Sequence, residues 1–214
     1  MEKKHLVLAS GSPRRKELLS QLGYEFSVLV TDVEECKHTQ ETAEEYVKRL
    51  SLDKALAALS LITTNPSEKQ HVAPSSDTVV VSSDAISLDS EIVVLGSDTV
   101  VVSQGQVLEK PADFSDSKRM LTQLANGRHQ VMTAVSVVSK EKQKTEIVIT
   151  DVWFKPLSEK EIEQYWQTGE PCDKAGSYGI QGLGGRFVTR IEGSYYAVVG
   201  LPLFETDQLL QEFL

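Results

Sequence analysis

The segment Ser10-Gly11-Ser12-Pro13-Arg14-Arg15 combines two hydroxyl groups with two guanidinium groups, between an expected strand and an expected helix. The start of a helix presents free backbone N–H groups and the positive end of the helix dipole, which together favour an anion. Arginine can also bind phosphate through two parallel hydrogen bonds. The GxxxxGK[ST] pattern of a Walker loop is absent. The residues alone leave two interpretations open, a phosphate-binding turn or a capped helix with two solvated arginines.

Acidic residues follow two of the expected strands. Asp98 stands at the end of an apolar run, and a carboxylate at the carboxyl end of a strand can hold Mg²⁺ or orient an attacking water. Asp32, Glu34 and Glu35 follow the second expected strand, where clustered acids repel one another unless a cation or water separates them. A lone aspartate in a turn and a solvated acidic cluster are the alternative interpretations.

Two lysines and a glycine-rich segment complete the candidate chemistry. Lys54 falls on an expected helix of apolar and small residues, and Lys110 precedes a proline. Both lysines could bind phosphate as point charges. The alternative is that each is an ordinary surface lysine. Residues 173–182 hold three glycines, which permit close backbone approach to a flat ligand. Within them, the Gln181 amide offers one donor group and one acceptor for the edge of a base. An irregular loop is the alternative.

Apolar periodicity predicts the elements that must position these side chains. A helix is predicted from Pro13 to a stop at Gly23. Interleaved helices and strands, with a hairpin at 131–154, predict an α/β fold whose mixed, partly antiparallel sheet is flanked by helices. Thr39 or Thr42 is expected to cap the second helix, and Ser158 with Glu161 forms an expected capping box. The remaining helices are predicted at 41–58, 115–124, 158–168 and 202–213, and the strands at 5–9, 26–30, 92–102, 107–108, 131–139, 146–154, 187–191 and 197–199.

One heptad occurs twice, at residues 76–82 and 97–103, so that Asp77 is a second copy of Asp98. Asp98 is the better candidate because an uninterrupted apolar strand precedes it, and Gly105 and Lys110-Pro111 follow it. Asp77 follows Pro74-Ser75-Ser76, which suits a surface loop. Asp98→Asn is therefore expected to abolish catalysis, and Asp77→Asn to preserve it.

The composition of the 214-residue chain argues against some classes of binding partner. Its net charge of -9 argues against binding a nucleic acid polymer, which needs a basic face, but not against a small polyphosphate. Cys36 and Cys172 lack zinc-ligand spacing. No apolar run approaches the roughly 20 residues that span a bilayer, and the first residues do not resemble a signal peptide. We therefore expect a cytoplasmic protein with no membrane partner.

Five motifs in order resemble the Maf family of nucleoside triphosphate pyrophosphatases over nearly the whole chain. The resemblance implies an inosine-triphosphatase-like fold with two lobes around a central cleft, in one domain spanning residues 1–214. It also implies that residues 63–91 are an inserted loop, longer than is usual, and that Glu34-Glu35 replaces the usual Asp-Glu pair. The motifs are Ala9-Ser10-Gly11-Ser12-Pro13-Arg14-Arg15-Lys16-Glu17-Leu18-Leu19, Leu95-Gly96-Ser97-Asp98-Thr99-Val100-Val101, Leu108-Glu109-Lys110-Pro111, Asp173-Lys174-Ala175-Gly176 and Val199-Gly200-Leu201-Pro202-Leu203.

The resemblance implies hydrolysis of a nucleoside triphosphate between the α and β phosphates, with Mg²⁺ as cofactor and Mn²⁺ as its alternative. Tyr178-Gly179-Ile180-Gln181-Gly182 resembles the branch that acts on dTTP and UTP, with modified pyrimidine nucleotides as further substrates. A 7-methyl-GTP pyrophosphatase and a non-catalytic nucleotide-binding regulator of cell division are the alternatives. The family has been linked to septum formation and to removal of non-standard nucleotides, and it suggests a homodimer.

The resemblance also assigns roles to individual residues. Asp98 is the proton acceptor or a metal ligand, two roles that the sequence does not separate, and Glu35 joins it as a candidate metal ligand. Glu35, Lys54, Asp98 and Lys110 are the implied catalytic set. The implied substrate-binding residues are Ser10, Ser12, Arg14, Arg15, Thr99 and Gln181, of which Arg14, Thr99 and Gln181 stand where the family sets base preference.

Overall fold

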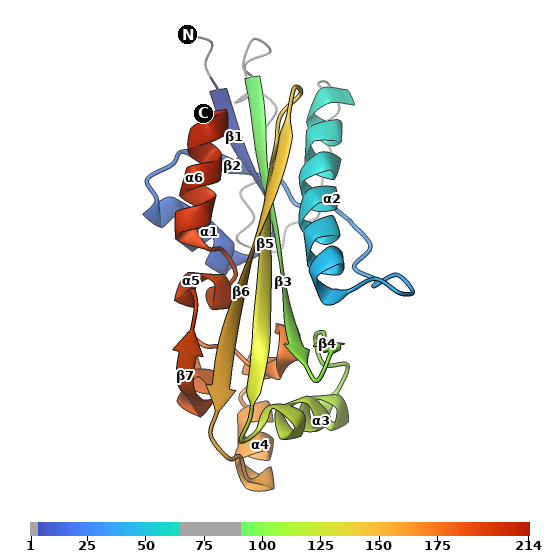
Figure 1. Ribbon diagram of the computed structural model, residues 1–214, viewed down its shortest axis with the longest axis vertical. Helices are drawn as coiled ribbons and strands as arrows, with labels where there is room; N and C mark the ends of the chain where they lie inside the picture. The colour runs from blue at the N-terminus through green and yellow to red at the C-terminus, as the bar shows by residue number, and fades with distance from the viewer. Residues whose placement is uncertain (1–3, 65–90) are drawn as a thin grey trace.

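The computed structural model describes residues 4–64 and 91–214 (Figure 1). Asp77, the first copy of the repeated heptad and most of the expected insertion lie outside these described residues. The assignment of the whole chain to one domain with an insertion therefore stays a prediction. Among the described helices, none combines the length and the apolar character that crossing a membrane requires.

The described strands form one mixed sheet in the order β2-β1-β3-β5-β6-β7, with β4 paired to β3 beside this path. β1 runs parallel to β2 and β3, whereas the other pairs are antiparallel. The mixed sheet and the β5–β6 hairpin are confirmed. The strands are β1 Lys4–Ala9, β2 Phe26–Val28, β3 Glu91–Ser103, β4 Gln106–Leu108, β5 Arg128–Val138, β6 Gln143–Phe154 and β7 Val188–Glu192.

Helices cover this sheet on both sides, as Figure 1 shows, with α2 on one side and α1 and α6 on the other. α3 and α4 lie together at the far end of the long strands. The helices are α1 Pro13–Gln21, α2 Ala43–Thr64, α3 Phe114–Leu124, α4 Glu159–Trp166, α5 Tyr195–Val199 and α6 Leu203–Phe213, with 3-10 turns at Glu170–Asp173, Ala175–Ser177 and Leu183–Phe187.

Local sequence signals explain where several helices begin. Ser12 caps α1 immediately before Pro13, and the predicted capping box of Ser158 and Glu161 starts α4. For α2, the cap is Thr42 rather than Thr39, since the Thr42 hydroxyl accepts a hydrogen bond from the Glu45 backbone N–H at 3.2 Å. Each of these caps satisfies backbone donors that the first helical turn leaves free.

The strands β3, β5 and β6 run through most of the length of the molecule and are shared by two lobes (Figure 1). In one lobe, α1 and α6 pack on one face of the sheet, where Leu8 of β1, Leu19 and Phe213 belong to one apolar core. In the other lobe, α3 and α4 pack around Leu121 and Tyr165. The expected two-lobed arrangement is therefore built on continuous strands.

Close packing of α2 against β3 depends on Gly96. A Cβ atom at this position would lie 2.9 Å from the backbone nitrogen of Ala55, on the helix. Backbone atoms cannot move aside as a flexible side chain can, so glycine permits this approach. The consequence is that Lys54, next to Ala55 on α2, faces the middle of β3.

Two predictions about elements were wrong. Residues 197–199 belong to α5 rather than to a strand, because the Ser194 side chain caps a short helix by accepting from the Ala197 backbone N–H. Asp98 does not end its strand, because β3 continues to Ser103. The strand that ends there is β1, whose last residue Ala9 pairs with Gly96, so Asp98 lies just beyond the carboxyl end of β1.

Candidate active site

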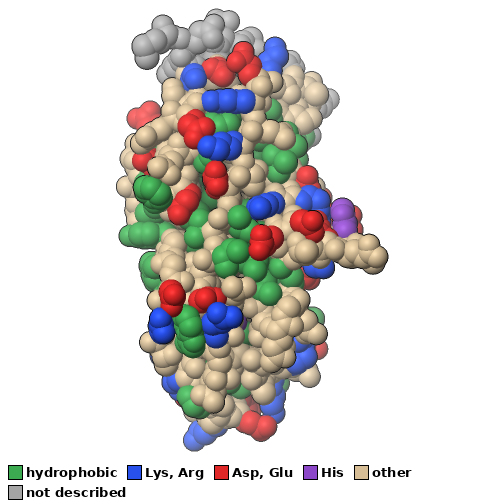
Figure 2. All heavy atoms as spheres, viewed as in Figure 1, with side chains coloured by type: hydrophobic (Ala, Val, Ile, Leu, Met, Phe, Trp, Pro, Cys, Tyr) green, Lys and Arg blue, Asp and Glu red, His purple; other side chains and the backbone are tan. Residues whose placement is uncertain are grey.

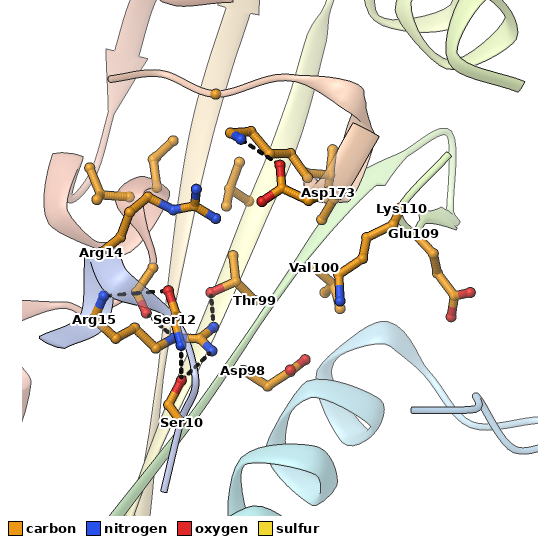
Figure 3. A pocket seen from close by; sticks show the side chains of 18 of the residues that line it. Ser10, Ser12, Arg14, Arg15, Asp98, Thr99, Val100, Glu109, Lys110 and Asp173 are labelled. Carbon is orange, nitrogen blue, oxygen red and sulfur yellow. Dashed lines mark hydrogen bonds and ion pairs between the residues drawn. The ribbon is translucent and has the colours of Figure 1, made fainter. Parts of the chain in front are cut away.

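A pocket of about 950 Å³ lies beyond the carboxyl end of β1, between the two lobes. Figure 3 shows side chains from the β1–α1 turn, β3 and the segment after β4 pointing into this space. The structure brings together the ten residues to which the family resemblance assigns roles, although none of these individual roles is tested by it. These lining residues are Ser10, Ser12, Arg14, Arg15, Glu35, Lys54, Asp98, Thr99, Lys110 and Gln181.

The β1–α1 turn is both a capped helix start and part of the pocket wall. The Ser12 hydroxyl accepts from the backbone N–H of Arg15 at 3.4 Å, and the Ser10 hydroxyl accepts from the backbone N–H of Ser12 at 3.2 Å. The two interpretations of this segment are therefore compatible. The positive end of α1 faces a concave space that also holds basic side chains.

Arg15 is fixed in place by several acceptors. Its Nε donates to the Gly200 carbonyl at 2.9 Å, Nη2 to the Thr99 hydroxyl at 3.1 Å and Nη1 to the Ser10 hydroxyl at 3.5 Å (Figure 3). Burial lowers the pKa of Arg15 from its ordinary value, while the nearby Asp98 carboxylate partly opposes this effect. The guanidinium is thus a preset cation whose position does not depend on a bound ligand.

A chain of hydroxyl groups supports Arg15 from behind. Thr133 donates to the Ala197 carbonyl at 2.7 Å, and its oxygen lies 3.0 Å from the Thr99 hydroxyl. Because the Thr133 proton is used on a carbonyl, Thr133 accepts from Thr99, and Thr99 in turn accepts from Arg15. The sequence analysis missed Thr133, although a threonine within the buried apolar run of β5 was an available signal.

Arg14 differs from its neighbour in its surroundings. Its side chain extends toward Asp173 on the opposite side of the pocket, as Figure 3 shows. Partial burial alone raises the pKa of Asp173, but the hydrogen bond from Lys174 and the charges of Lys174 and Arg14 outweigh it, and the net shift is downward. The two adjacent arginines therefore serve different ends of the pocket.

The central charged group consists of Lys54 between two carboxylates. Lys54 Nζ lies 2.6 Å from Glu35 Oε1 and 2.7 Å from Asp98 Oδ1. Lys110 Nζ lies 3.5 Å from Glu35 Oε2 and is largely exposed. Partial burial raises the pKa of Glu35, but the hydrogen bond and charge of Lys54, helped by Lys110, hold it below its ordinary value.

The donor set of Glu35 and Asp98 suits one kind of metal site. In the part of the chain that the structure describes, no three His, Cys, Asp or Glu side chains gather as a metal cluster. Zinc and calcium sites built from protein alone need more ligands than these two carboxylates. Mg²⁺ typically takes one or two carboxylates together with substrate phosphates and water, which this pair fits. Of the acidic segment after β2, Glu35 lines this pocket, whereas Asp32 and Glu34 do not.

The far end of the pocket is formed by the glycine-rich segment. Tyr178, Gly179 and Gln181 line it together with Glu170 and Lys174. Gln181 was named from the sequence but Glu170 was not, because Glu170 lies three residues before the segment 173–182 and belongs to no local motif. Figure 2 shows that acidic and basic side chains are interspersed over the face viewed, in keeping with a local binding site rather than a broad basic surface.

The sequence profile of the family described as Maf-like protein matches residues 5–213. A dTTP/UTP pyrophosphatase from Vibrio parahaemolyticus is 65% identical over 209 residues, which is 98% of this chain and 97% of that protein. A protein of the same name from Vibrio cholerae is 58% identical over 208 residues, 97% of each chain. Another from Saccharophagus degradans is 47% identical over 208 residues, 97% of this chain and 88% of that protein.

Proposed function

Because the chain belongs to the Maf family, we propose that it is a nucleoside triphosphate pyrophosphatase that hydrolyses dTTP and UTP to the monophosphate and pyrophosphate. The observation that carries this function is the convergence of Glu35, Lys54 and Asp98 beside the hydrogen-bonded Arg15, in a chain 65% identical to a dTTP/UTP pyrophosphatase. A pocket of about 950 Å³ is also large enough for a nucleotide.

Cationic groups along the pocket suit the triphosphate. Arg15, the helix start at Ser12 and the two lysines Lys54 and Lys110 surround the space beside Asp98. Fixed cations of this kind stabilise the negative charge that grows on the leaving pyrophosphate, and they do so without reorganising during the reaction. Arg15 contributes most directly, because its hydrogen bonds to Gly200 and Thr99 already hold it in position.

The proposed chemical step is attack of water on the α phosphorus. The new bond joins the water oxygen to the α phosphorus, the bond to the bridging oxygen breaks, and pyrophosphate leaves with that oxygen. Asp98 is our candidate to accept the proton from water, since its carboxylate lines the pocket and is only 7% exposed. Lys54, at 2.7 Å, holds the carboxylate in place.

We further propose that Glu35 and Asp98 hold a divalent cation, Mg²⁺ or alternatively Mn²⁺. When bound, such a cation neutralises phosphate charge and lowers the pKa of coordinated water. Lys54 then shares the two carboxylates with the cation. The test is to remove divalent ions with EDTA, which should abolish pyrophosphate release, and to restore it with excess Mg²⁺; undiminished release in EDTA would contradict the metal proposal.

Pyrophosphate release from dTTP in the presence of Mg²⁺ is the experiment that tests the function. The expected result is multiple turnovers on dTTP and UTP, with a lower kcat/KM on 7-methyl-GTP. Preference for 7-methyl-GTP would support the alternative branch. Saturable binding of dTTP without any pyrophosphate release would support the non-catalytic regulator. A homodimer stays a prediction from the family resemblance, and a cytoplasmic location stays a prediction from the composition of the sequence.

A further inference from the structure

Two side chains outside the proposed catalytic group hold the glycine-rich segment that carries Gln181. These are Tyr165, near the end of α4, and Glu170, at the start of the next 3-10 turn. Tyr165 is buried, and Glu170 lines the pocket at the end remote from β1. Apart from the hydrogen bond that joins them, these two side chains accept hydrogen bonds from the backbone N–H groups of Gly179, Leu183 and Gly184.

The Glu170 carboxylate accepts from three donors at once. Oε2 accepts from the Leu183 backbone N–H at 2.8 Å, and Oε1 accepts from the Gly184 backbone N–H at 3.0 Å. Oε1 also accepts from the Tyr165 hydroxyl at 2.7 Å, and that hydroxyl accepts from the Gly179 backbone N–H at 3.1 Å. The backbone is thus held on both sides of Gln181.

Packing leaves no freedom around these contacts. A Cβ atom at Gly182 would lie 2.6 Å from Glu170 Oε1, and one at Gly184 would lie 2.6 Å from the Tyr165 hydroxyl. Glycine at these positions therefore lets the segment lie directly on Glu170 and Tyr165. Partial burial raises the pKa of Glu170, but the hydrogen bonds from Gly184, Tyr165 and Leu183 outweigh it and lower the pKa overall.

The placement of these groups separates two tasks within one pocket. Ser10, Arg15 and Lys54 lie at the end formed by β1, α1 and α2, where cations suit the triphosphate. The Glu170 carboxylate uses three of its roughly four acceptor positions on the Leu183 and Gly184 backbone and on Tyr165, which favours a structural support over a metal ligand. What it supports is the position of the Gln181 amide.

We propose that Glu170, assisted by Tyr165, is a positioning residue that determines base preference by fixing the segment that carries Gln181. This inference rests on the proposed hydrolysis of dTTP and UTP. An amide discriminates between base edges only when its donor and acceptor stay in a fixed place, because a mobile side chain adapts to a wrong partner. Loosening the segment should therefore cost selectivity before it costs catalysis.

The test compares Glu170→Ala, Glu170→Gln and Tyr165→Phe with the unmodified enzyme. For each, kcat and KM are measured with dTTP and with dATP, together with the inhibition constant of pyrophosphate, which needs only the phosphate end. In Glu170→Ala, the dTTP-to-dATP ratio of kcat/KM should fall about tenfold or more through KM for dTTP, as loss of hydrogen bonds to a charged group predicts. For Glu170→Gln and Tyr165→Phe, this ratio should lie between the values of Glu170→Ala and of the unmodified enzyme, since each variant keeps some of the hydrogen bonds.

Glu163→Gln is the matched control, because it removes an exposed carboxylate from α4. This variant should leave kcat, KM and the inhibition constant of pyrophosphate unchanged. An unchanged dTTP-to-dATP ratio in the folded Glu170 variants would overturn the inference, and so would a parallel loss on both nucleotides with weaker pyrophosphate inhibition. If Glu170→Ala fails to fold, Glu170→Gln and Tyr165→Phe decide the matter. No pyrophosphate release from dTTP by the unmodified enzyme would instead refute the proposed function.

Discussion

At the scale of single residues, the pocket depends on side chains whose partners are already in place. Arg15 donates to three acceptors, and Lys54 lies between two carboxylates. Burying a charged group is costly unless such partners compensate for the lost water. The structure therefore holds these charges for a purpose other than stability, and single substitutions among them should separate binding from catalysis.

Asp98→Asn should lower kcat for dTTP by about 100-fold or more, because the amide keeps the shape of the side chain but can neither accept the water proton nor balance the nearby cations. Steady-state pyrophosphate release measures the effect. Asp77→Asn, in the other copy of the repeated heptad, is the comparison and should retain activity. Full activity of Asp98→Asn would refute the role proposed for this carboxylate.

Thr133→Val should lower kcat/KM by about tenfold, the scale expected for one hydrogen bond supporting a charged group. Valine removes the acceptor for the Thr99 hydroxyl and so loosens the support of Arg15. Thr133→Ser keeps the hydroxyl and should retain most of the activity. If the valine and serine variants behave alike, the hydroxyl chain does not position Arg15.

At the scale of elements, the contact between α2 and β3 decides where Lys54 lies. The two elements are far apart in the sequence, and Gly96 permits their backbones to approach. The packing of a helix on a strand thus sets the distance between an ammonium group and a carboxylate. A change in the packing should be felt in both the stability of the fold and the activity of the site.

Gly96→Ala should lower the free energy of unfolding by about 1–3 kcal/mol, the usual cost of inserting a methyl group where there is no space. The added methyl would meet Ala55 and move α2 away from β3, so kcat should fall as well. Urea unfolding and dTTP turnover measure the two effects. Ser60→Ala, at an exposed position of α2, is the control and should change neither; equal stability of both variants would contradict the packing argument.

Elements with strong local signals could be predicted from the sequence. The Ser158–Glu161 capping box, the Pro13 helix start and the β5–β6 hairpin each follow from neighbouring residues. The short helix α5 could not be told from a strand, since its five residues span little more than one turn and the decisive cap is one hydroxyl of Ser194. The periodicity of apolar residues does not show whether a run as short as this one forms a capped helix or a strand.

The sequence predicted several of the residues that line the pocket, but not how these residues lie relative to one another. Motif resemblance identified Lys54, Asp98 and Glu35, yet nothing local indicates that the lysine lies between the two acids. That contact joins residues 44 positions apart and depends on how α2 packs on β3. Thr133 and Glu170 were missed for the same reason, because their importance arises from tertiary contacts with Thr99 and with the Gly179–Gly184 backbone.

At the scale of the whole molecule, one buried histidine links stability to pH. His129, on β5, is 2% exposed, its Nε2 lies 2.9 Å from the Tyr178 hydroxyl, and its ring packs edge-on against Phe154 and Tyr178. Its Nδ1 has no hydrogen-bond partner among the described residues. Burial lowers the pKa of His129 to about 4, with a smaller opposing effect of the Asp151 charge.

The protein should therefore lose stability as the pH falls from about 6.5 to about 4. In this window the unfolded chain binds a proton at His129 whereas the folded chain does not, so protonation favours unfolding, by about 3 kcal/mol in total. Urea unfolding at several pH values measures the slope. His129→Gln should be less stable at pH 7 but should have a shallower slope, and an unchanged slope would show that other groups carry the pH dependence.

The strands shared by the two lobes also affect how substrate enters the pocket and how product leaves it. β3 pairs with β5, and β5 with β6, through continuous ladders that cross from one lobe to the other. A hinge motion that shut the pocket would have to bend or twist these ladders, which resist a large rotation of one lobe against the other. Nucleotide entry and pyrophosphate escape should therefore depend little on rotation of the two lobes, and their rates should respond to ionic attraction and its screening by salt.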